Sequence, residues 1–166
     1  MCGICGELRL DGERPDLEAI ARMTRRLAPR GPDHEGSYSD GPLGFGHRRL
    51  AIIDLSERAN QPMVDQELGL ALVFNGTIYN YPTLRQTLKD KGYHFFSEGD
   101  SEVIIKAWHA WGEQCVDHLQ GMFAFAIWDQ HKKQLFMARD RLGIKPLYYM
   151  QTGDLFRFAS NVQALL

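Results

Sequence analysis

Hydrophobic and polar positions divide the first half of the chain into strand-like and helix-like segments. Residues 3–10 mix glycine with β-forming side chains and predict a strand at the N-terminus. Asp16 can cap a helix that ends near Pro29, with an apolar face of Leu17, Ile20, Ala21, Thr24 and Leu27. Residues 43–55 and 68–74 predict two more strands, the second broken at Asn75-Gly76, a strong turn signal.

The second half of the chain predicts two helices followed by strands. Asn80 and Pro82 resemble the cap and first turn of a helix that Gly92 closes. Asp100 begins a second helix, ended by Gly112. The segments 122–128, 134–138, 146–150 and 155–159 then predict antiparallel strands separated by polar turns. Helices between two groups of strands, without strict alternation, favour an α+β fold over a doubly wound parallel sheet.

Length and charge narrow the classes of function. A chain of 166 residues suits one domain. Its net charge of −2 gives no electrostatic footprint for nucleic acid or an anionic membrane. There is no apolar run near the ~20 residues that a membrane span needs, and no signal-peptide pattern, so a cytoplasmic protein is expected. A small polar ligand fits this composition better than a nucleic acid.

Nucleotide and metal motifs are absent from the sequence. Neither the P-loop pattern nor the glycine-rich dinucleotide fingerprint occurs, so no ATP chemistry is expected from these residues. The six histidines have no paired-ligand spacing. Cys2-Gly3-Ile4-Cys5 is formally a redox or zinc motif, but it lies in a predicted strand and has no second cysteine pair. Cys5 and Cys115 are expected to be small buried hydrophobic residues.

Cys2 is the strongest candidate nucleophile. Removal of Met1, which is usual before a small residue, would place a thiol and a free α-amine on the same residue. An α-amine with an ordinary pKa of about 7.7 to 8.0 can take the proton of the thiol near neutral pH. If Met1 remains, its peptide bond removes that base.

Two adjacent arginines suggest a carboxylate-binding site. Arg48 and Arg49 lie in a strand-like run, where neighbouring side chains point to opposite faces, so one of them points inward. A bidentate guanidinium is suited to a ligand carboxylate. An internal salt bridge is the alternative, and spacing alone favours it.

Two further segments have an ordinary and a functional interpretation. Asn75 and the N–H of Gly76 could donate to an oxyanion, although this dipeptide is more often a hairpin turn. Asp100 could cap a helix or bind a ligand ammonium group. Spacing does not separate these alternatives.

With these residues identified, the chain resembles the class II glutamine amidotransferases, and among them the N-terminal glutaminase domain of asparagine synthetase-like proteins. Nearly the whole chain takes part, and the motifs occur in the order of the family. They are Met1–Ile4, Arg30–Asp33, His47–Ile52, Asn75–Asn80, Gly99–Ile104, Gly121–Ala126 and Arg139–Tyr149.

The resemblance implies an N-terminal nucleophile hydrolase fold, a four-layer αββα sandwich, and hydrolysis of L-glutamine to glutamate and ammonia. Cys2 would attack the side-chain amide and form a thioester. Asn75 and Gly76 would hold the oxyanion, Arg49 the α-carboxylate and Asp100 the α-ammonium. Backbone groups near Ile52 and Ile53 would also contact glutamine. The loop containing Arg30 is expected to move over the bound substrate.

Two positions depart from the family. Thr77 stands where asparagine synthetases usually carry an acid, so Asp100 would bind the ammonium alone. Asn161 replaces the usual Glu in the segment that leads toward the synthetase domain, so coupling to that domain would differ. The pattern leaves both asparagine synthetase proper and the N-acetylglutaminylglutamine amidotransferase branch open.

The resemblance also sets expectations for domains and partners. Residues 1–166 are expected to be an excised glutaminase domain, because the family continues into an ATP-using synthetase domain. No cofactor is expected here, and ATP and magnesium belong to that missing domain. The expected partners are L-glutamine, the synthetase domain and, through an uncovered surface, a second copy of the chain. The alternative is an inactive interaction domain that docks onto a synthetase partner.

Overall fold

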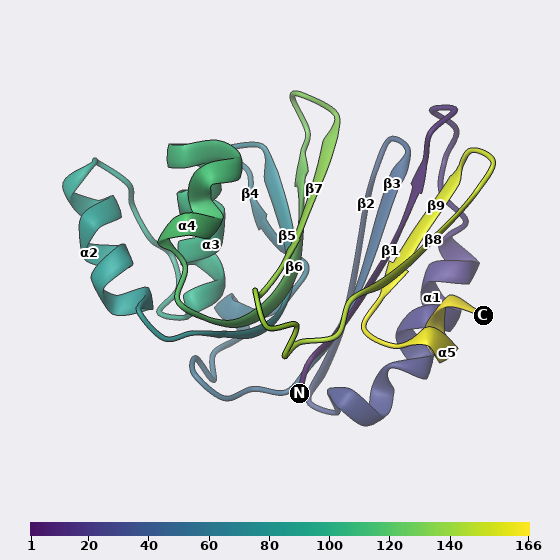
Figure 1. Cartoon of the computed structure of the whole chain (residues 1–166), viewed down its shortest axis with the longest axis horizontal. Coiled ribbons are helices and arrows are strands. Elements are labelled where there is room, and N and C mark those ends of the chain that lie inside the picture. Colours follow the sequence, from purple (N-terminus) through teal and green to yellow (C-terminus); the bar gives the residue numbers. More distant parts are fainter.

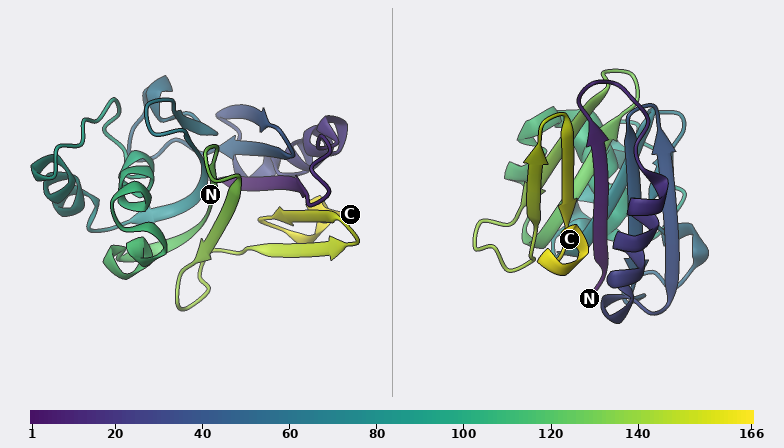
Figure 2. Two further views of the ribbon diagram at one scale, coloured as in Figure 1. Left: turned by 90° about the horizontal axis from the view of Figure 1, so that it is seen from above. Right: turned by 90° about the vertical axis from the view of Figure 1, so that its right-hand side faces the viewer.

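The computed structural model describes residues 1–166 as two antiparallel sheets packed face to face, with helices on both outer faces (Figure 1). The view from above shows the four layers in succession, and the side view looks through them from the α1 layer (Figure 2). The predicted α+β, four-layer αββα fold is therefore confirmed.

The first sheet has the strand order β2-β3-β1-β9-β8. Its N-terminal strand lies in the middle and pairs with β3 on one side and β9 on the other. The strands are β1 (Gly3–Arg9), β2 (His34–Asp40), β3 (Leu43–Arg49), β8 (Tyr148–Thr152) and β9 (Leu155–Ala159). The residue after Met1 and Cys2 thus enters the centre of a sheet.

The second sheet has the order β4-β5-β6-β7. Its strands are β4 (Met63–Asp65), β5 (Leu70–Ile78), β6 (Gly121–Asp129) and β7 (Gln134–Arg139). The strands β5 and β6 are paired along their whole length, from Leu70 opposite Asp129 to Ile78 opposite Gly121.

Two groups of helices form the outer layers (Figure 1). The first sheet is covered by α1 (Leu17–Arg26) and α5 (Val162–Leu165), and the second by α2 (Tyr81–Asp90), α3 (Asp100–Trp111) and α4 (Cys115–His118). Three 3₁₀ turns, at Ala28–Arg30, Glu57–Ala59 and Gly112–Gln114, connect these elements.

Side chains alternate between two apolar cores along each inner strand. On β5, Ala71 and Val73 face the other sheet, whereas Leu70, Leu72 and Phe74 pack under α2 and α3. The strand β6 alternates in the same way. Because both faces of these strands are covered, their sequences read as continuous apolar runs rather than as an alternation.

Two local predictions were wrong, and one strand was not predicted. No element was predicted for the polar segment of β2, since only every second residue of it is even half-buried. Asn75-Gly76 is not a turn, because β5 continues through it to Ile78. On α1, Leu17 is 58% exposed, and the buried face instead includes Ala19 and Met23.

The capping predictions had mixed outcomes. Asp16 caps α1 by accepting the N–H of Ala19 at 2.9 Å, as predicted. Asn80 precedes α2 but makes no side-chain cap, since its amide donates to the carbonyl of His118 and accepts the N–H of Gln120. Asp100 is the first residue of α3, and Gly99 occupies the cap position.

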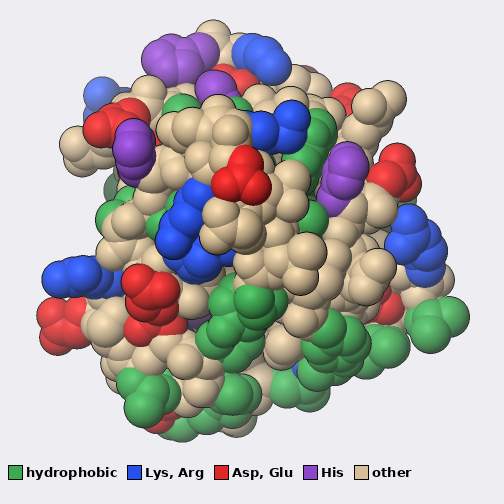
Figure 3. All heavy atoms as spheres, turned by 90° about the vertical axis from the view of Figure 1, so that its left-hand side faces the viewer, with side chains coloured by type: hydrophobic (Ala, Val, Ile, Leu, Met, Phe, Trp, Pro, Cys, Tyr) green, Lys and Arg blue, Asp and Glu red, His purple; other side chains and the backbone are tan.

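The helical face over the second sheet carries acidic and basic side chains interspersed with one another, and hydrophobic side chains gather along its lower part (Figure 3). The view shows no large area of one charge, which agrees with the net charge of −2. None of the helices combines the length and apolar character that a membrane crossing requires.

Candidate active site

The pocket that contains Cys2 lies at the end of the space between the two sheets, where apolar side chains give way to polar ones. Residues facing the other sheet repeat every two positions. The series that starts with Phe45 on β3 continues to His47 and Arg49, and the series with Val73 on β5 continues to Asn75. The strand period therefore brings these polar side chains, and Cys2 two residues before Ile4, to one end of the sandwich.

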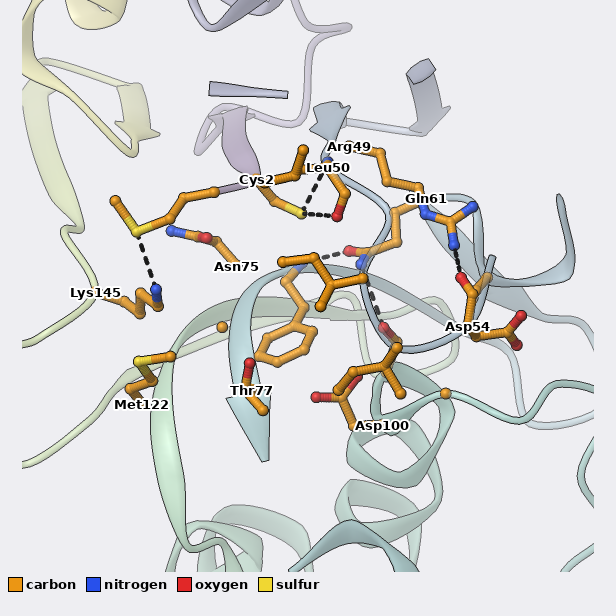
Figure 4. A pocket seen from close by; sticks show the side chains of 18 residues that line it. Cys2, Arg49, Leu50, Asp54, Gln61, Asn75, Thr77, Asp100, Met122 and Lys145 are labelled. Carbon is orange, nitrogen blue, oxygen red and sulfur yellow. Dashed lines mark hydrogen bonds between the residues drawn. The ribbon is translucent and has the colours of Figure 1, made fainter. Parts of the chain in front are cut away.

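The pocket has a volume of about 170 Å³. This is below the roughly 300–1,000 Å³ of sites for drug-sized ligands, and it suits a ligand no larger than an amino acid. All eight residues predicted as catalytic or substrate-binding line it: Cys2, Arg49, Ile52, Ile53, Asn75, Gly76, Thr77 and Asp100 (Figure 4).

The thiol of Cys2 is held against the backbone of Leu50. Its Sγ accepts the N–H of Leu50 at 3.4 Å and lies 3.6 Å from the Leu50 carbonyl oxygen, to which it can donate (Figure 4). Burial raises the pKa of this thiol, while the hydrogen bond from Leu50 and the nearby Arg49 oppose that rise. A thiol with a raised pKa needs a base to become a nucleophile.

Asn75 and Gly76 lie in the middle of a strand next to this thiol. The Asn75 side chain is 1% exposed, and its Nδ2 donates to no protein group. A buried amide without a partner costs free energy unless a ligand fills the role. A Cβ at Gly76 would lie 2.2 Å from the Met122 carbonyl oxygen, so only glycine fits between β5 and β6 at this point.

The two arginines of β3 point to opposite faces, as predicted. Arg48 forms an ion pair with Glu35. Arg49 is 7% exposed and has no carboxylate within 4.0 Å, so the inward-pointing arginine forms no internal salt bridge, and the Arg48–Glu35 pair is partly exposed. The Arg49 guanidinium instead donates to oxygen atoms of the segment that closes this side of the pocket, those of Asp54, Ser56 and Asn60.

Asp100 brings a buried carboxylate to the floor of the pocket. Its side chain is 5% exposed, and Oδ2 accepts the N–H of Ile78 at 2.9 Å. Burial raises the pKa of this carboxyl group, and the hydrogen bond from Ile78 opposes that rise. No basic side chain lies within 4.0 Å of it, so the carboxylate can pair with a cationic ligand.

The remaining predicted residues lie at the mouth of the pocket. Ile52 and Ile53 are 69% and 37% exposed, on an irregular segment after β3. Because these side chains are exposed to solvent, the backbone of this segment is better placed than the side chains to contact a ligand. Thr77 is half-buried on β5, between Met122 and Asp100 in Figure 4.

Sequence reasoning missed several residues that line the pocket, among them the buried polar side chains of Gln61 and Lys145. Gln61 is buried, accepts the N–H of Phe74 at 2.6 Å and donates to Ser101 at 3.3 Å, so it links β5 to α3. Lys145 is 5% exposed, and its Nζ lies 3.0 Å from the sulfur of Met1. Lys145 belongs to the Arg139–Tyr149 motif of the resemblance, but the spacing of a single lysine predicts no function.

The other cysteines lie apart from the pocket. Cys5 and Cys115 are fully buried and free, as predicted for small hydrophobic residues, and burial raises the pKa of each thiol to about 12. Cys5 contacts Thr24 and Gly46, whereas Cys2 contacts Leu50. The two thiols of the Cys2–Cys5 motif therefore have separate surroundings.

The four-layer αββα sandwich is the N-terminal nucleophile hydrolase fold, and the Cys2 thiol lies at the start of the central strand of one of its sheets. The solved structure of glutamine phosphoribosylpyrophosphate amidotransferase from Bacillus subtilis, complexed with ADP and GMP, shares this fold with a TM-score of 0.83 at 22% identity, over 99% of this chain and 43% of that chain. A second structure, described as the allosteric regulatory enzyme of purine biosynthesis, has a TM-score of 0.78, also at 22% identity.

Sequence comparison identifies the family of this chain. The glutamine amidotransferase domain model matches residues 1–166, and the chain belongs to this family. It is thus an enzyme domain of the glutamine-hydrolysing amidotransferase class, as predicted.

Curated relatives agree with this assignment. The chain is 40% identical over 169 residues to asparagine synthetase [glutamine-hydrolyzing] 3 of Bacillus subtilis, which covers 100% of this chain and 27% of that protein. It is 39% identical over 184 residues to the putative asparagine synthetase [glutamine-hydrolyzing] 2 of Methanocaldococcus jannaschii, covering 100% of this chain and 35% of that protein. The amidase chry2 of Gibberella zeae is 40% identical over 178 residues, with 100% and 26% covered. The chain therefore spans about a third or less of the length of these relatives.

Proposed function

We propose that this domain hydrolyses L-glutamine to glutamate and ammonia, and that the ammonia supplies an ATP-dependent amidation in a synthetase domain like that of the asparagine synthetases. The observation that carries this proposal is the pocket in which a thiol, the unpartnered side-chain amide of Asn75, an arginine and a carboxylate converge.

Binding of glutamine uses the two charged groups of the pocket. The α-carboxylate pairs with the Arg49 guanidinium, and the α-ammonium pairs with the Asp100 carboxylate. Backbone groups of Ile52 and Ile53 close the mouth, and Thr77 borders the ammonium site. These contacts direct the side-chain amide of glutamine toward Cys2.

The reaction then follows from the groups around the thiol. After Met1 is removed, the α-amine of Cys2 takes the proton from Sγ, and the thiolate attacks the amide carbon. The Asn75 amide and the Gly76 N–H donate to the oxyanion, an arrangement worth a few kcal/mol per donor in comparable sites. The ammonium returns its proton to the leaving nitrogen, ammonia departs, and a γ-glutamyl thioester remains. Water attacks this thioester, again with the amine as base, and releases glutamate and the thiol.

The protein around this domain is part of the proposal. We assign residues 1–166 to a glutaminase domain that precedes a synthetase domain, and the small matched share of the relatives, 27% and 35%, supports a longer protein. No cofactor is required in this domain, and ATP and magnesium would be used by the synthetase domain. Three free cysteines fit a cytoplasmic protein. The alternative of an inactive docking domain gains no support from a pocket in which all predicted residues converge.

Glutamate release from L-glutamine tests the proposal directly. The purified chain is compared with Cys2→Ala, and intact mass shows whether Met1 is gone. We expect turnover that the Cys2→Ala substitution abolishes. Cys5→Ala is the matched control, since this thiol is buried against Thr24 and should leave the activity unchanged.

The two cysteine variants also separate the competing classes. Loss of activity in both would favour the redox or zinc interpretation of the motif. Absence of turnover in a processed wild-type chain would favour the inactive docking domain.

A further inference from the structure

Lys145 is a buried cation without an anionic partner. It is 5% exposed, and no carboxylate lies within 4.0 Å of its Nζ. The other buried lysine, Lys106, pairs with Asp65 and lies 3.8 Å from Glu102. Buried lysines are almost always paired in this way, because desolvation of an ammonium group is costly. The unpaired charge of Lys145 therefore calls for an explanation beyond packing.

The loop after β7 is built to hold Lys145 in this place. The Asp140 carboxylate accepts the N–H groups of Lys145 at 3.0 Å and of Ile144 at 2.8 Å, and also that of Phe123 on β6 at 3.1 Å. Arg139 donates to the carbonyl oxygen of Lys145 at 2.6 Å. The backbone of Lys145 is thus fixed from both sides, and its side chain is directed into the pocket (Figure 4).

The side chain ends beside the N-terminus. Its Nζ lies 3.0 Å from the sulfur of Met1, the residue whose removal frees the α-amine of Cys2. Arg30 approaches the same residue from another element and donates from Nε to the Cys2 carbonyl oxygen at 3.0 Å. Arg49 is a third cation near the thiol. Positive groups from three separate elements therefore lie close to Cys2, the residue that would carry the amine.

The neighbouring acids form no ion pair with Lys145, although the charge of Asp140 favours its protonated form. Asp100 is tied to the N–H of Ile78, on the α3 side of the pocket. Asp140 is occupied by backbone N–H groups of its own loop. His47 is fully buried, and burial lowers its pKa to about 3, so it is neutral at physiological pH.

We propose that Lys145 is a positioning residue whose positive charge keeps the α-amine of processed Cys2 unprotonated near neutral pH, an inference that rests on the proposed function. A nearby like charge disfavours protonation of an amine. The amine must be neutral to accept the proton of the Cys2 thiol. Burial and then the Arg30 charge lower the pKa of Lys145 itself, while Cys2 and Asp140 oppose that fall.

A pH profile of kcat/KM distinguishes this role from others. Its rising limb reports the base of the free enzyme. In Lys145→Met the limb should move upward by about one pH unit, so that activity falls several-fold at pH 7 and recovers at high pH. Lys145→Arg, which keeps the charge, should leave the limb near its wild-type position.

Other roles for Lys145 predict different profiles. A donor to the oxyanion would lower kcat equally at every pH, with no displacement of the limb. A structural role would lower the unfolding temperature, whereas removal of an unpaired buried charge should leave it unchanged or raise it. Lys89→Met, an exposed change on α2, is the control and should alter neither quantity. An unshifted limb in Lys145→Met overturns the proposal.

A second measurement does not depend on glutamine turnover. In Cys2→Ala, with loss of Met1 checked by intact mass, trace labelling with acetic anhydride across a pH series titrates the α-amine, read from the N-terminal peptide. Adding Lys145→Met should raise the pKa of this amine by about one unit. An unchanged titration refutes the role of Lys145. If the titration shifts but the wild-type chain hydrolyses no glutamine, the electrostatic role of Lys145 stands and only the proposed function is refuted.

Discussion

The carboxylate of Asp100 accepts the backbone N–H of Ile78 at 2.9 Å, which ties the first residue of α3 to the last residue of β5. Gly76 and Thr77 lie just before Ile78 on the same strand. The proposed oxyanion and ammonium sites are therefore held at a fixed spacing by one hydrogen bond. In the proposed reaction the same carboxyl group both braces the pocket and binds substrate.

Two substitutions of Asp100 separate these tasks. Asp100→Asn keeps an oxygen acceptor for Ile78 but loses the charge, so KM for glutamine should rise about tenfold or more with little change in stability. Asp100→Ala should raise KM similarly and also lower the free energy of unfolding by about 1–3 kcal/mol, because a buried N–H loses its acceptor. Initial rates and urea unfolding measure the two effects. An unchanged KM in Asp100→Asn would exclude the ammonium contact.

Arg49 and Arg48 form a natural pair of variants. Arg49→Met removes the proposed carboxylate partner and the hydrogen bonds to Asp54, Ser56 and Asn60, so KM should rise at least about tenfold. Arg48→Met removes a half-exposed ion pair with Glu35, which should alter stability by about 1 kcal/mol or less. Steady-state kinetics on both variants test this contrast, and equal effects on KM would contradict it.

A substitution at Thr77 should increase the affinity for glutamine. Placing an acid at this position, as in Thr77→Glu, adds a second anion beside the ammonium site and should lower KM by roughly threefold. Thr77→Gln, of similar size and without charge, should not. The double variant Asp100→Asn with Thr77→Glu should recover part of the affinity that Asp100→Asn loses, and no recovery would place the ammonium elsewhere.

Gly76 is constrained by backbone on the neighbouring strand. In Gly76→Ala the new methyl group would lie 2.2 Å from the Met122 carbonyl oxygen and 2.8 Å from the Phe123 Cα, so β5 and β6 would have to separate. We expect a loss of about 2 kcal/mol or more in urea unfolding. At Gly99, the nearest atom to a new methyl group is the Asp54 Cβ at 3.4 Å, an ordinary contact. Gly99→Ala should therefore cost less than about 1 kcal/mol, and similar losses at both positions would contradict the steric argument.

His47 should make stability depend on pH. Burial lowers its pKa to about 3 in the folded state, against about 6.5 in the unfolded chain. Between these values the unfolded state binds the additional proton, so stability falls as the pH drops from 6.5 toward 3, by roughly 1.4 kcal/mol per pH unit. The difference between wild type and His47→Gln in urea unfolding at pH 4.5, 5.5 and 7.5 isolates this contribution, and parallel curves would refute it.

Much of the fold followed from local sequence, because the apolar runs and helix faces are strong signals. The prediction of a turn at Asn75-Gly76 was wrong because glycine is favoured in two different backbone situations. A backbone that bends and a backbone that another strand approaches closely both favour it, and only the position of β6 selects the second.

The residues of the site were also predicted unevenly, because local patterns in the sequence record some of their positions and not others. Every second residue of a strand lies on the same face, so His47 and Arg49 share the inward face of Phe45, and Asn75 shares that of Val73. This periodicity alone could have placed these side chains before any resemblance was used. Lys145 could not be found in this way. Its position depends on hydrogen bonds from Arg139 and Asp140 within an irregular loop, and no periodic pattern records them.

The central place of β1 determines when the site can form. This strand needs β3 on one side and β9, about 150 residues later in sequence, on the other, and Ile4 and Ser160 exchange two hydrogen bonds across that second seam. A chain still under synthesis lacks this neighbour until nearly the whole domain has left the ribosome. Its first residues therefore stay accessible to an aminopeptidase throughout translation, and the pocket around the Cys2 thiol forms only afterwards.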